Sequence, residues 1–486
     1  MRNRATHESW KVRADGSDCG PPVKTPRILV VAGVASGVGK TTVTLGLLEA
    51  FRRRGLVVQG FKVGPDFIDP GFHEIVTGRG SYNLDGWMCG HDYVLATVAR
   101  RAADADLAIV EGVMGCFDGL DATSDEGSTA QIAKWLDAPV VLVIDAQAQA
   151  GSAAAVALGF EQFDPDMKLA AVIINRVGGV THARSVRDAI SARCAARVMG
   201  ALVYDEQIAL AERHLGLVTA GEGSLTAAKR SRLADAIERS VDLEGLLELA
   251  APVPVSAKSS DPGRTPTSTV RIGVAHDAAF CFYYRDNLEL LMAAGAELVY
   301  WSPLTERTLP PVDGLYLGGG YPELHGAALG ANKVMREAVR AFASAGRPVY
   351  AECGGLMYLA DALEDPEGVR HPMVGLLPAT VRMRPRRLSL SYTEVTLQTA
   401  SPLGPPGAIA RGHEFHFSTL DPVPASVAHT YRLRRHGGAD CEEGYRIGNT
   451  LLSYVHLHFG SNPELATNFV RACREERGCH DTRTEG

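Results

Sequence analysis

The sequence predicts two α/β domains joined by a linker, and three observations lead to this fold class. Short, β-branched apolar runs alternate with longer segments that can form helices, which is the pattern of βαβ units around a parallel sheet. A glycine-rich loop follows the first run, at the edge of an α/β sheet where ligands bind. A stretch rich in Pro, Ser and Thr then interrupts the alternation, and a second alternation follows it.

The first domain is predicted over residues 27–250, after a polar and aperiodic tail over residues 1–26. Its strands are expected at the β-branched runs Ile28–Ala32, Leu56–Phe61, Leu107–Val110, Val140–Ile144 and Ala170–Ile174. Two longer segments between these runs, Thr41–Arg54 and Gly127–Leu136, are expected to form helices. Strands that alternate with helices in this way indicate a parallel sheet covered by helices on both faces.

The linker is predicted over residues 251–269, the second domain over residues 270–475, and a short tail over residues 476–486. The strands of the second domain are expected at Val270–Ala275, Glu297–Trp301, Gly314–Leu317 and Val349–Ala351. An amphipathic helix is expected over Asn332–Ala345. This second alternation of strands and helices predicts another α/β domain.

Composition narrows the class of protein. The chain has 486 residues, enough to bury several cores without disulfides or a structural metal. Its 49 Lys and Arg against 56 Asp and Glu give a net charge of −7, which argues against binding to nucleic acid or to an anionic membrane. The nine cysteines are scattered, odd in number and free of CxxC spacing, as in a reduced, cytoplasmic protein. We expect neither a secretory signal nor a membrane span.

The segment after the first strand has the features of a phosphate-binding loop. It contains Gly33, Gly37 and Gly39, followed at once by Lys40, Thr41 and Thr42. Glycine amides in such a loop surround phosphate oxygens, and the helix that follows adds its partial positive charge. Lys40 is expected to reach the terminal phosphates, and Thr41 to offer its hydroxyl to Mg²⁺. Five residues, rather than the four of the common motif, separate Gly33 from Gly39.

Several polar side chains follow the predicted strands of the first domain. Asp66 and Asp69 come after the second strand, three residues apart, and Glu111 and Asp118 come after the third. Carboxylates at these strand ends could bind Mg²⁺ or orient a reacting group, although Asp beside Pro and Gly is also common in turns. Asn175, at the end of the fifth strand, suits an adenine edge or a turn. The residues alone leave both interpretations open.

The second domain contains the pattern of an acyl-transfer site. Cys353 stands on a glycine-flanked turn between a strand and a helix, which would expose its sulfur at the helix N-terminus and lower the pKa of the thiol. Upstream, Gly319 and Gly320 offer amides for an oxyanion hole. Near the end of the domain, His456 is the candidate base and His458 the alternative. A buried, inert cysteine is the usual alternative interpretation.

These motifs resemble the family of cobyrinic acid and hydrogenobyrinic acid a,c-diamide synthases, the glutamine- and ATP-dependent enzymes of corrinoid synthesis. The similarity runs from Arg27 to about Pro463. Its blocks, in order, are SGVGKTT, KVGPDFIDPGFH, EGVMGCFDG, ERHLGL from Glu212, DAAFCFYY, GGGYPE, AECGG, RGHEFH from Arg411 and YVHLHF. The first domain is also similar to dethiobiotin synthetase, whose phosphate loop shares the five-residue spacing, and the second to class I glutamine amidotransferases.

The resemblance implies an activity and a role for each candidate residue. Cys353 would attack the side-chain amide of glutamine, and His456 would assist it and protonate the departing ammonia. The phosphate loop and Asn175 would hold ATP. The residues implied to hold Mg²⁺ are Thr41, Asp69 and Glu111, and those implied to handle the substrate or its acyl phosphate are Asp66, Asp69 and Asp118. Ammonia would convert the acyl phosphate to an amide, at the c and then the a carboxylate.

Some alternatives stay open at this point. Many class I amidotransferases carry a Glu two residues after the catalytic His, whereas this chain has His458 there, so what orients His456 is undecided. The related synthase that acts on a nickel tetrapyrrole and cobyric acid synthase contain the same two modules, and the sequence does not name the metal of the ring. A phosphate-loop switch ATPase would explain the first domain but leave Cys353 without a role. Whether the chain forms a homodimer is also open.

Overall fold

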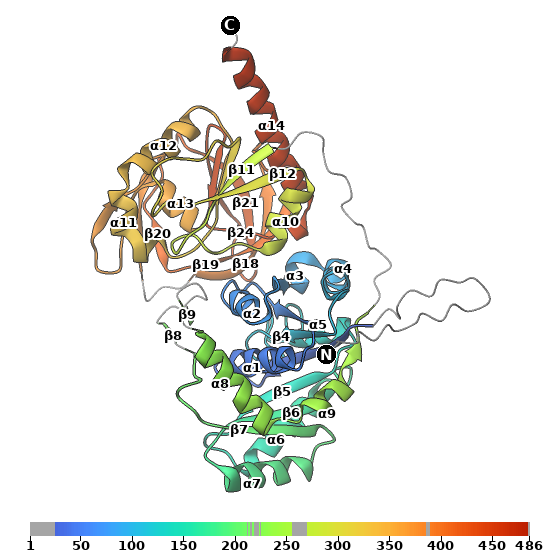
Figure 1. The fold of residues 1–486 in the computed structure, drawn as a ribbon. Coiled ribbons are helices and arrows are strands. Elements are labelled where there is room, and N and C mark those ends of the chain that lie inside the picture. Colours follow the sequence, from blue (N-terminus) through green and yellow to red (C-terminus); the bar gives the residue numbers. More distant parts are fainter. Residues whose placement is uncertain are drawn as a thin grey trace, which may run out of the picture.

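The computed structural model describes residues 25–210, 212–213, 216–217, 223, 225–254, 270–384 and 389–484. The expected tail up to residue 24, residues 255–269 of the expected linker and His214 of the ERHLGL block lie outside these residues. Two separate sheets, each with its own helices, lie one above the other in Figure 1. We call residues 25–254 the N-terminal half and residues 270–484 the C-terminal half. The two α/β halves confirm the predicted fold class.

The main sheet of the N-terminal half is parallel in all but one strand. Its strands are β1 (Arg27–Gly33), β2 (Val58–Val63), β3 (Tyr82–Leu84), β4 (Leu107–Glu111), β5 (Val140–Asp145), β6 (Leu169–Val177), β7 (Arg197–Val203) and β10 (Ala251–Pro252). They follow the order β3-β2-β4-β1-β5-β6-β7, and β10 pairs antiparallel with β1. The predicted linker therefore starts too early, because residues 251–252 belong to this sheet.

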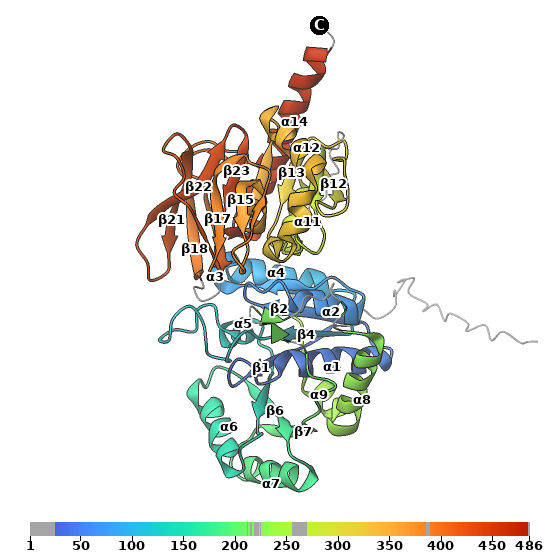
Figure 2. The same ribbon diagram turned by 90° about the vertical axis from the view of Figure 1, so that its left-hand side faces the viewer.

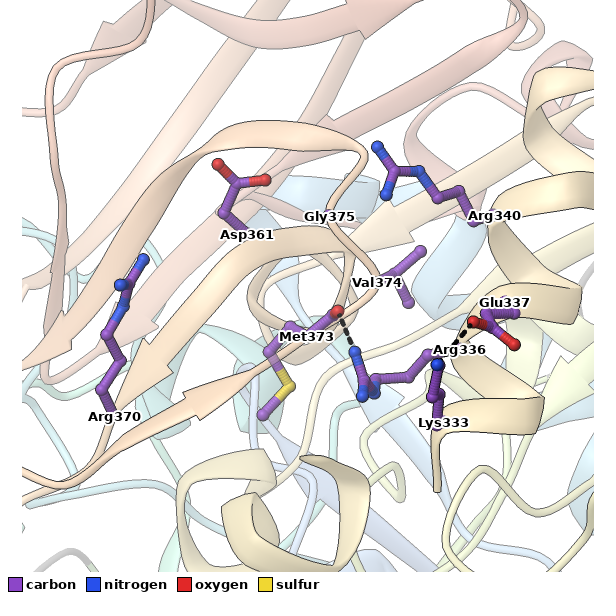
Figure 3. Close-up of a pocket in the computed structure, with 9 residues that line it drawn as sticks. All are labelled: Lys333, Arg336, Glu337, Arg340, Asp361, Arg370, Met373, Val374 and Gly375. Carbon is purple, nitrogen blue, oxygen red and sulfur yellow. Dashed lines mark hydrogen bonds and ion pairs between the residues drawn. The ribbon is translucent and has the colours of Figure 1, made fainter. Parts of the chain in front are cut away.

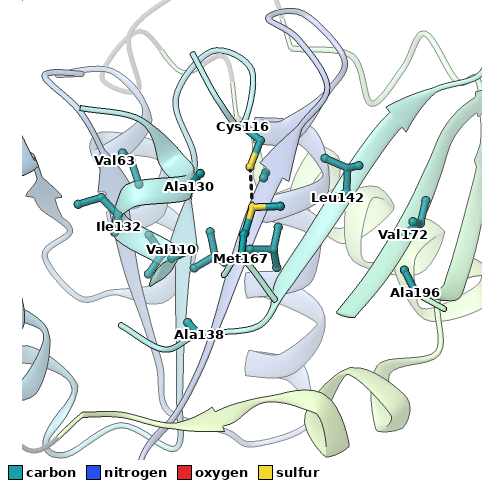
Figure 4. Close-up of a cluster of buried hydrophobic side chains, with 14 of the residues drawn as sticks. Val63, Val110, Cys116, Ala130, Ile132, Ala138, Leu142, Met167, Val172 and Ala196 are labelled. Carbon is teal, nitrogen blue, oxygen red and sulfur yellow. Dashed lines mark hydrogen bonds between the residues drawn. The ribbon is translucent and has the colours of Figure 1, made fainter. Parts of the chain in front are cut away.

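Helices cover both faces of this sheet. They are α1 (Lys40–Arg53), α2 (Asp69–Thr77), α3 (Gly86–Cys89), α4 (His91–Ala102), α5 (Thr129–Trp135), α6 (Gly151–Phe163), α7 (Val180–Ser191), α8 (Ala227–Ser240) and α9 (Leu243–Leu249), with a small hairpin of β8 (Glu212–Arg213) and β9 (Gly216–Leu217) before α8. Consecutive strand residues point into opposite layers: Val110 and Leu142 pack into the one shown in Figure 4, Ile109 and Val141 into the other. All four side chains are fully buried, as expected for a parallel sheet.

The main sheet of the C-terminal half is mixed. Its strands, in spatial order, are β12 (Ala296–Trp301), β11 (Val270–Ala275), β13 (Gly314–Leu317), β14 (Val349–Glu352), β23 (Thr450–Ser453), β22 (Cys441–Ile447), β21 (Ala428–Arg435), β18 (Ser389–Leu397), β19 (Ile409–His416) and β24 (His456–Leu457). The first five are parallel and the others antiparallel. A smaller sheet contains β16 (Arg370–Pro372), β15 (Ala360–Glu364), β17 (Leu377–Met383) and β20 (Ser418–Leu420).

The helices of the C-terminal half are α10 (Arg285–Ala293), η2 (Pro322–His325), α11 (Gly326–Ala331), α12 (Lys333–Ser344), α13 (Gly354–Leu359), η3 (Phe459–Ser461) and α14 (Glu464–Thr484). The last helix continues to Thr484, past residue 476 where a tail was expected. It extends away from both sheets in Figures 1 and 2. In the described part of the chain, no helix is both long and apolar enough to cross a membrane.

The two halves contact each other through α2, α3 and α4 on one side and α10, β18 and β19 on the other (Figure 1). Hydrogen bonds from tyrosine and arginine join them, among them Tyr93 Oη to Asp286 Oδ1 (2.9 Å), Tyr82 Oη to Glu289 Oε1 (2.7 Å), Tyr392 Oη to Asp85 Oδ2 (2.6 Å) and Arg411 Nη1 to Trp87 O (2.9 Å). These contacts bring the loops that follow β2 and β24 to the same interface.

Candidate active sites

The phosphate-loop segment connects β1 to α1 in a conformation that requires glycine. Gly37 and Gly39 have φ angles of 76° and 94°, in the left-handed region. A Cβ atom on Gly33 would lie 2.7 Å from the Val38 side chain and 2.8 Å from that of Lys40. The loop therefore turns tightly before α1 begins at Lys40, with Thr41 and Thr42 in the first turn of that helix.

Lys40 lies across this loop. Its ammonium donates to the carbonyls of Ala35 (3.0 Å) and Met114 (2.5 Å), from the loops after β1 and β4. Burial, followed by the nearby Lys62 ammonium, lowers the pKa of Lys40 to about 8. A lysine that is partly desolvated and held by carbonyls gains from an anionic partner, which fits its expected role toward phosphate.

Asn175, predicted to bind ATP, braces the same loop from β6. Its Nδ2 donates to Val38 O (2.8 Å), and its Oδ1 accepts from the amide of Arg176 (2.9 Å). A Cβ on Gly39 would lie 2.2 Å from Nδ2, so the amide lies directly against the loop. The structure thus gives Asn175 a supporting contact; its contact with adenine stays a prediction.

A buried polar cluster lies beside the loop. Glu111, at the end of β4, accepts from Thr41 Oγ1 (2.6 Å) and lies 2.7 Å from His73 Nε2. Lys62, at the end of β2, places its Nζ 2.5 Å from Asp69 Oδ2 and 3.2 Å from Glu111 Oε1. Lys62 and His73 were not among the sequence candidates. The only sequence signal was their place in KVGPDFIDPGFH, one at each end of that block.

Charge and burial oppose each other in this cluster. Burial alone would raise the pKa of Glu111, but Lys62 and the hydrogen bonds from His73 and Thr41 lower it below its usual value. Burial would lower the pKa of Lys62, whereas Asp69 and Glu111 raise it. Burial, Asp66 and Glu111 together raise the pKa of Asp69 well above its usual value. The Lys62 cation therefore offsets the cost of burying the Glu111 and Asp69 carboxylates.

Two of the three residues expected to hold Mg²⁺ have oxygens placed for that role. Asp69 Oδ1 is buried and has no hydrogen-bond partner among the described residues, and Thr41 Oγ1 lies 3.4 Å from Asp69 Oδ2. Protein sites for Mg²⁺ commonly supply one or two carboxylates and leave the other positions to water and phosphate oxygens. Thr41 and Asp69 fit such a site, and Glu111 is joined to it through the Thr41 hydroxyl.

Asp66 and Asp118 both form turns. Asp66 Oδ1 accepts from the amides of Ile68 (2.7 Å) and Asp69 (3.0 Å). Asp118 Oδ2 accepts from the amide of Gly115 (2.8 Å), in the loop whose Met114 carbonyl binds Lys40. The turn interpretation therefore holds for one oxygen of each carboxylate, and contact of either residue with a substrate stays a prediction.

Cys353 occupies a sharp turn between β14 and α13. Its φ and ψ angles are 46° and −98°, a conformation that side chains rarely adopt, and its amide donates to Ser453 O (2.8 Å). The sulfur is not exposed as expected, because only 4% of the residue is accessible. Burial and the nearby Glu323 raise the pKa of the thiol, although the Gly354 amide opposes them. The predicted lowering of this pKa is therefore wrong: the six-residue α13 does not outweigh burial.

The glycine turn after β13 lies against this elbow. Gly355 N donates to Gly318 O (3.0 Å), and a Cβ on Gly354 would lie 3.1 Å from Gly320 N. The amide of Gly319 donates to Phe282 O (3.3 Å). Of the two predicted oxyanion amides, Gly320 thus faces the elbow, while Gly319 already has a partner. Their role in an oxyanion hole stays a prediction.

His456 adjoins the same turn. A Cβ on Gly319 would lie 2.4 Å from His456 Cε1, so Cys353 and His456 flank one glycine segment. Burial, with a contribution from His416, lowers the pKa of His456 to about 3, so the ring is neutral near pH 7.

His458, the alternative base, faces the N-terminal half. Its Nδ1 lies 3.3 Å from Cys89 Sγ and accepts from Gly460 N (3.0 Å). Asp286 Oδ2 lies 3.9 Å from His458 Nε2. These contacts assign His458 to the interface between the halves, and they favour His456 as the base beside Cys353.

Sequence reasoning also missed a group of rings around His456. Its members are Phe67 and His413, which contact the His456 ring, and Phe282 and Tyr284, which contact Phe67. Phe67 belongs to the N-terminal half and the other three to the C-terminal half. All belong to the blocks KVGPDFIDPGFH, DAAFCFYY and RGHEFH of the sequence analysis. No residue type in those blocks predicts that their rings are in contact.

A cavity of about 380 Å³ lies elsewhere, between α12 and the strands β15 and β16 (Figure 3). Its lining residues are Lys333, Arg336, Glu337, Arg340, Asp361, Arg370, Met373, Val374 and Gly375. Arg336 Nη1 donates to Met373 O (2.8 Å), so one of the cationic side chains that line the cavity is bound to the backbone. The cavity contains none of the predicted site residues.

The chain matches known proteins along most of its length. Residues 29–218 match the CobQ/CobB/MinD/ParA nucleotide binding domain, and residues 271–464 the CobB/CobQ-like glutamine amidotransferase domain. Three relatives, each named cobyrinate a,c-diamide synthase, come from Syntrophotalea carbinolica, Synechococcus sp. and Salmonella typhimurium, at 49%, 44% and 41% identity. Each alignment covers 92% of this chain, and 99%, 98% and 98% of the respective relative. By this similarity over both halves, the chain belongs to the cobyrinate a,c-diamide synthase family.

Proposed function

We propose that this protein uses ATP and glutamine to amidate the a and c carboxylates of cobyrinic acid or hydrogenobyrinic acid. The observation that carries the proposal is that one chain presents a lysine-bearing phosphate loop and a strained cysteine elbow in two halves that contact each other. The printed name of the relatives supplies the substrate class. We assign residues 27–250 to the ATP-dependent synthetase and residues 270–475 to the glutaminase, both working in the cytoplasm, where ATP and glutamine are available.

In the glutaminase, the Cys353 sulfur attacks the side-chain carbonyl carbon of glutamine. His456 takes the thiol proton and gives it to the departing nitrogen, so that ammonia leaves and a glutamyl thioester remains. The buried His456 ring is neutral near pH 7, so it has a nitrogen free of a proton, although burial disfavours the imidazolium that forms when it takes the thiol proton. The amide of Gly320 is the proposed donor to the carbonyl oxygen as it becomes negative, and the Gly319 amide would join it by giving up its bond to Phe282 O. Water then hydrolyses the thioester to glutamate.

In the synthetase, the loop glycines and Lys40 hold the phosphates of ATP. An oxygen of the corrinoid carboxylate attacks the γ-phosphorus, ADP leaves, and an acyl phosphate forms. Ammonia then attacks the acyl carbon, phosphate leaves, and a proton is lost to give the amide. Asp66, Asp69 and Asp118 are proposed to orient the substrate and this intermediate. Mg²⁺, held by Thr41, Asp69 and Glu111, would neutralise phosphate charge.

The test is to supply the purified chain with ATP, Mg²⁺ and glutamine, together with one acid at a time. The panel is cobyrinic acid, hydrogenobyrinic acid and a nickel sirohydrochlorin, and the readouts are ADP release and the mass of the product. Two carboxyl-to-amide conversions on one of the first two acids are expected. Glutamate release without a change of mass in any acid would refute the proposed substrate.

A further inference from the structure

One loop of the N-terminal half reaches into the glutaminase. Phe67 follows Asp66 directly and lies two residues before Asp69, so it shares the loop of the proposed nucleotide-side acids. Its ring centroid lies 4.7 Å from that of Tyr284, 5.1 Å from that of His456, 5.2 Å from that of Phe282 and 5.5 Å from that of His413. All four of these rings belong to the C-terminal half.

The His456 ring is enclosed by packing. His413 stacks on it with centroids 5.0 Å apart, Gly319 leaves no room for a side chain against Cε1, and Phe67 provides a third contact. Among the described residues, Nδ1 of His456 has no hydrogen-bond partner. In most cysteine–histidine pairs a third group orients the imidazole by a hydrogen bond. Here the described surroundings of His456 supply rings instead.

These rings are themselves fixed. Tyr284 Oη lies 2.8 Å from His413 Nδ1, which holds the stacking partner of His456 in place. Phe67 contacts both Tyr284 and His413, and so closes the group from the side of the N-terminal half. Removing the Phe67 ring would leave His456 with a free side and a void beside it.

The backbone of the Phe67 loop is tied on both sides of the ring. Asp66 Oδ1 accepts from Asp69 N (3.0 Å), and the Asp66 carbonyl accepts from Asn83 Nδ2 (2.8 Å). The two proposed nucleotide-side acids therefore flank Phe67 in the chain, with only Ile68 between Phe67 and Asp69, so the position of its ring is linked to theirs.

We propose that Phe67 is a positioning residue of the glutaminase: its ring holds His456 in register with Cys353, and its loop makes glutamine hydrolysis respond to the nucleotide site. The inference rests on the proposed function, since it takes Cys353 and His456 as the glutaminase pair. It adds that the N-terminal half completes this pair. Glutamine hydrolysis is then fastest when the acceptor for ammonia is in place.

The experiment compares the full chain with Phe67→Ala, with Phe67→Tyr, which keeps a ring, and with Phe163→Ala as a matched control. Phe163 is 73% exposed, and its ring contacts Phe117 of its own half. Two activities are measured for each protein: glutamate release from glutamine, with and without ATP and cobyrinic acid, and ADP release with ammonium as the nitrogen source.

Phe67→Ala is expected to lower kcat for glutamate release about 10- to 100-fold, because a catalytic group misplaced by an ångström loses rate on that scale. KM for glutamine should change by less than about twofold, since the binding contacts remain. The acceleration by ATP and cobyrinic acid should disappear, while ammonium-driven ADP release stays close to that of the unchanged protein. Phe67→Tyr should recover most of kcat, and Phe163→Ala should behave as the unchanged protein.

Glutamate release by Phe67→Ala at the normal rate, with normal acceleration, would overturn the proposal. So would a loss of ammonium-driven activity in this variant alone, because the defect would then belong to the nucleotide loop. If the unchanged protein itself fails with ammonium and cobyrinic acid but hydrolyses glutamine, the proposed substrate is wrong, and glutamate release still decides the role of Phe67.

Discussion

The buried acids beside the phosphate loop depend on one cation, and Lys62→Met tests this dependence. The Lys62 side chain is 3% exposed, and its Nζ lies 2.5 Å from Asp69 Oδ2 and 3.2 Å from Glu111 Oε1. Methionine keeps the apolar stem but removes the charge, so two carboxylates stay buried without a counterion. Breaking a buried pair in this way costs about 3–5 kcal/mol, and we expect the free energy of unfolding near neutral pH to fall by that amount.

The pH dependence of this deficit has a defined sign. In the unchanged protein the folded-state pKa of Glu111 is lowered by Lys62 and by hydrogen bonds, despite burial, so its stabilising effect is present above the usual pKa of 4.5 and is lost as the pH falls. Without Lys62, burial raises the pKa values of Glu111 and Asp69, and their protonation relieves the penalty. The deficit of Lys62→Met should therefore shrink as the pH falls from about 8 to about 5.

Urea unfolding of the full chain at several pH values measures both effects. The matched control is Lys168→Met, because Lys168 is paired with Asp137 at the surface, with side chains 56% and 77% exposed. That change should cost no more than about 1 kcal/mol. Adding Asp69→Asn to Lys62→Met should restore part of the loss. A deficit below about 1 kcal/mol, or one that grows toward acid pH, would refute the reasoning.

Three further variants test the two sites and the interface. Cys353→Ser should lower glutamine-driven amidation more than about a hundredfold while ammonium-driven amidation continues. Product formation with each nitrogen source measures this, and equal losses with both sources would contradict the role of Cys353 as the nucleophile. Lys40→Ala should lower ADP release at least about a hundredfold with either source, and a normal rate would remove Lys40 from the phosphate site. Burial raises the pKa of Asp85 to about 6 against the hydrogen bonds from Met88 N and Tyr392, so its contribution to stability is lost as the pH rises from about 4 to about 6. Tyr392→Phe removes one of these hydrogen bonds and should lower the free energy of unfolding by about 1.5–3 kcal/mol at pH 8 and by less at pH 5. Thermal unfolding at the two pH values measures this, and equal destabilisation at both would contradict it.

The parallel strands could be predicted because burial on both faces makes them continuous apolar runs. The one clear displacement has a physical cause: β2 was expected at Leu56–Phe61 and lies at Val58–Val63, since it includes the buried Lys62, which an apolar pattern leaves out. The antiparallel strands β18, β19, β21 and β22 were not predicted. A strand such as β18 (Ser389–Leu397) mixes polar and apolar residues, and its partners are far away in the chain.

The candidate residues were found where a local motif carries the chemistry, as at Lys40 and Cys353. What escaped prediction depends on packing between distant segments. The pKa of the Cys353 thiol is raised because the protein buries the elbow, which the turn sequence does not reveal. Phe67 reads as an ordinary apolar residue between two prolines, and its contact with His456 exists only once the two halves meet.

The backbone of Cys353 implies a conflict between durability and activity at a single position. Its φ of 46° and ψ of −98° suit glycine, and holding any other residue there costs about 1–3 kcal/mol. Selection for resistance to heat alone would therefore replace this cysteine with glycine, and Cys353→Gly should melt at a higher temperature than Cys353→Ser. The proposed reaction requires the sulfur of Cys353. The chain therefore keeps a side chain at a position where it lowers the stability of the fold.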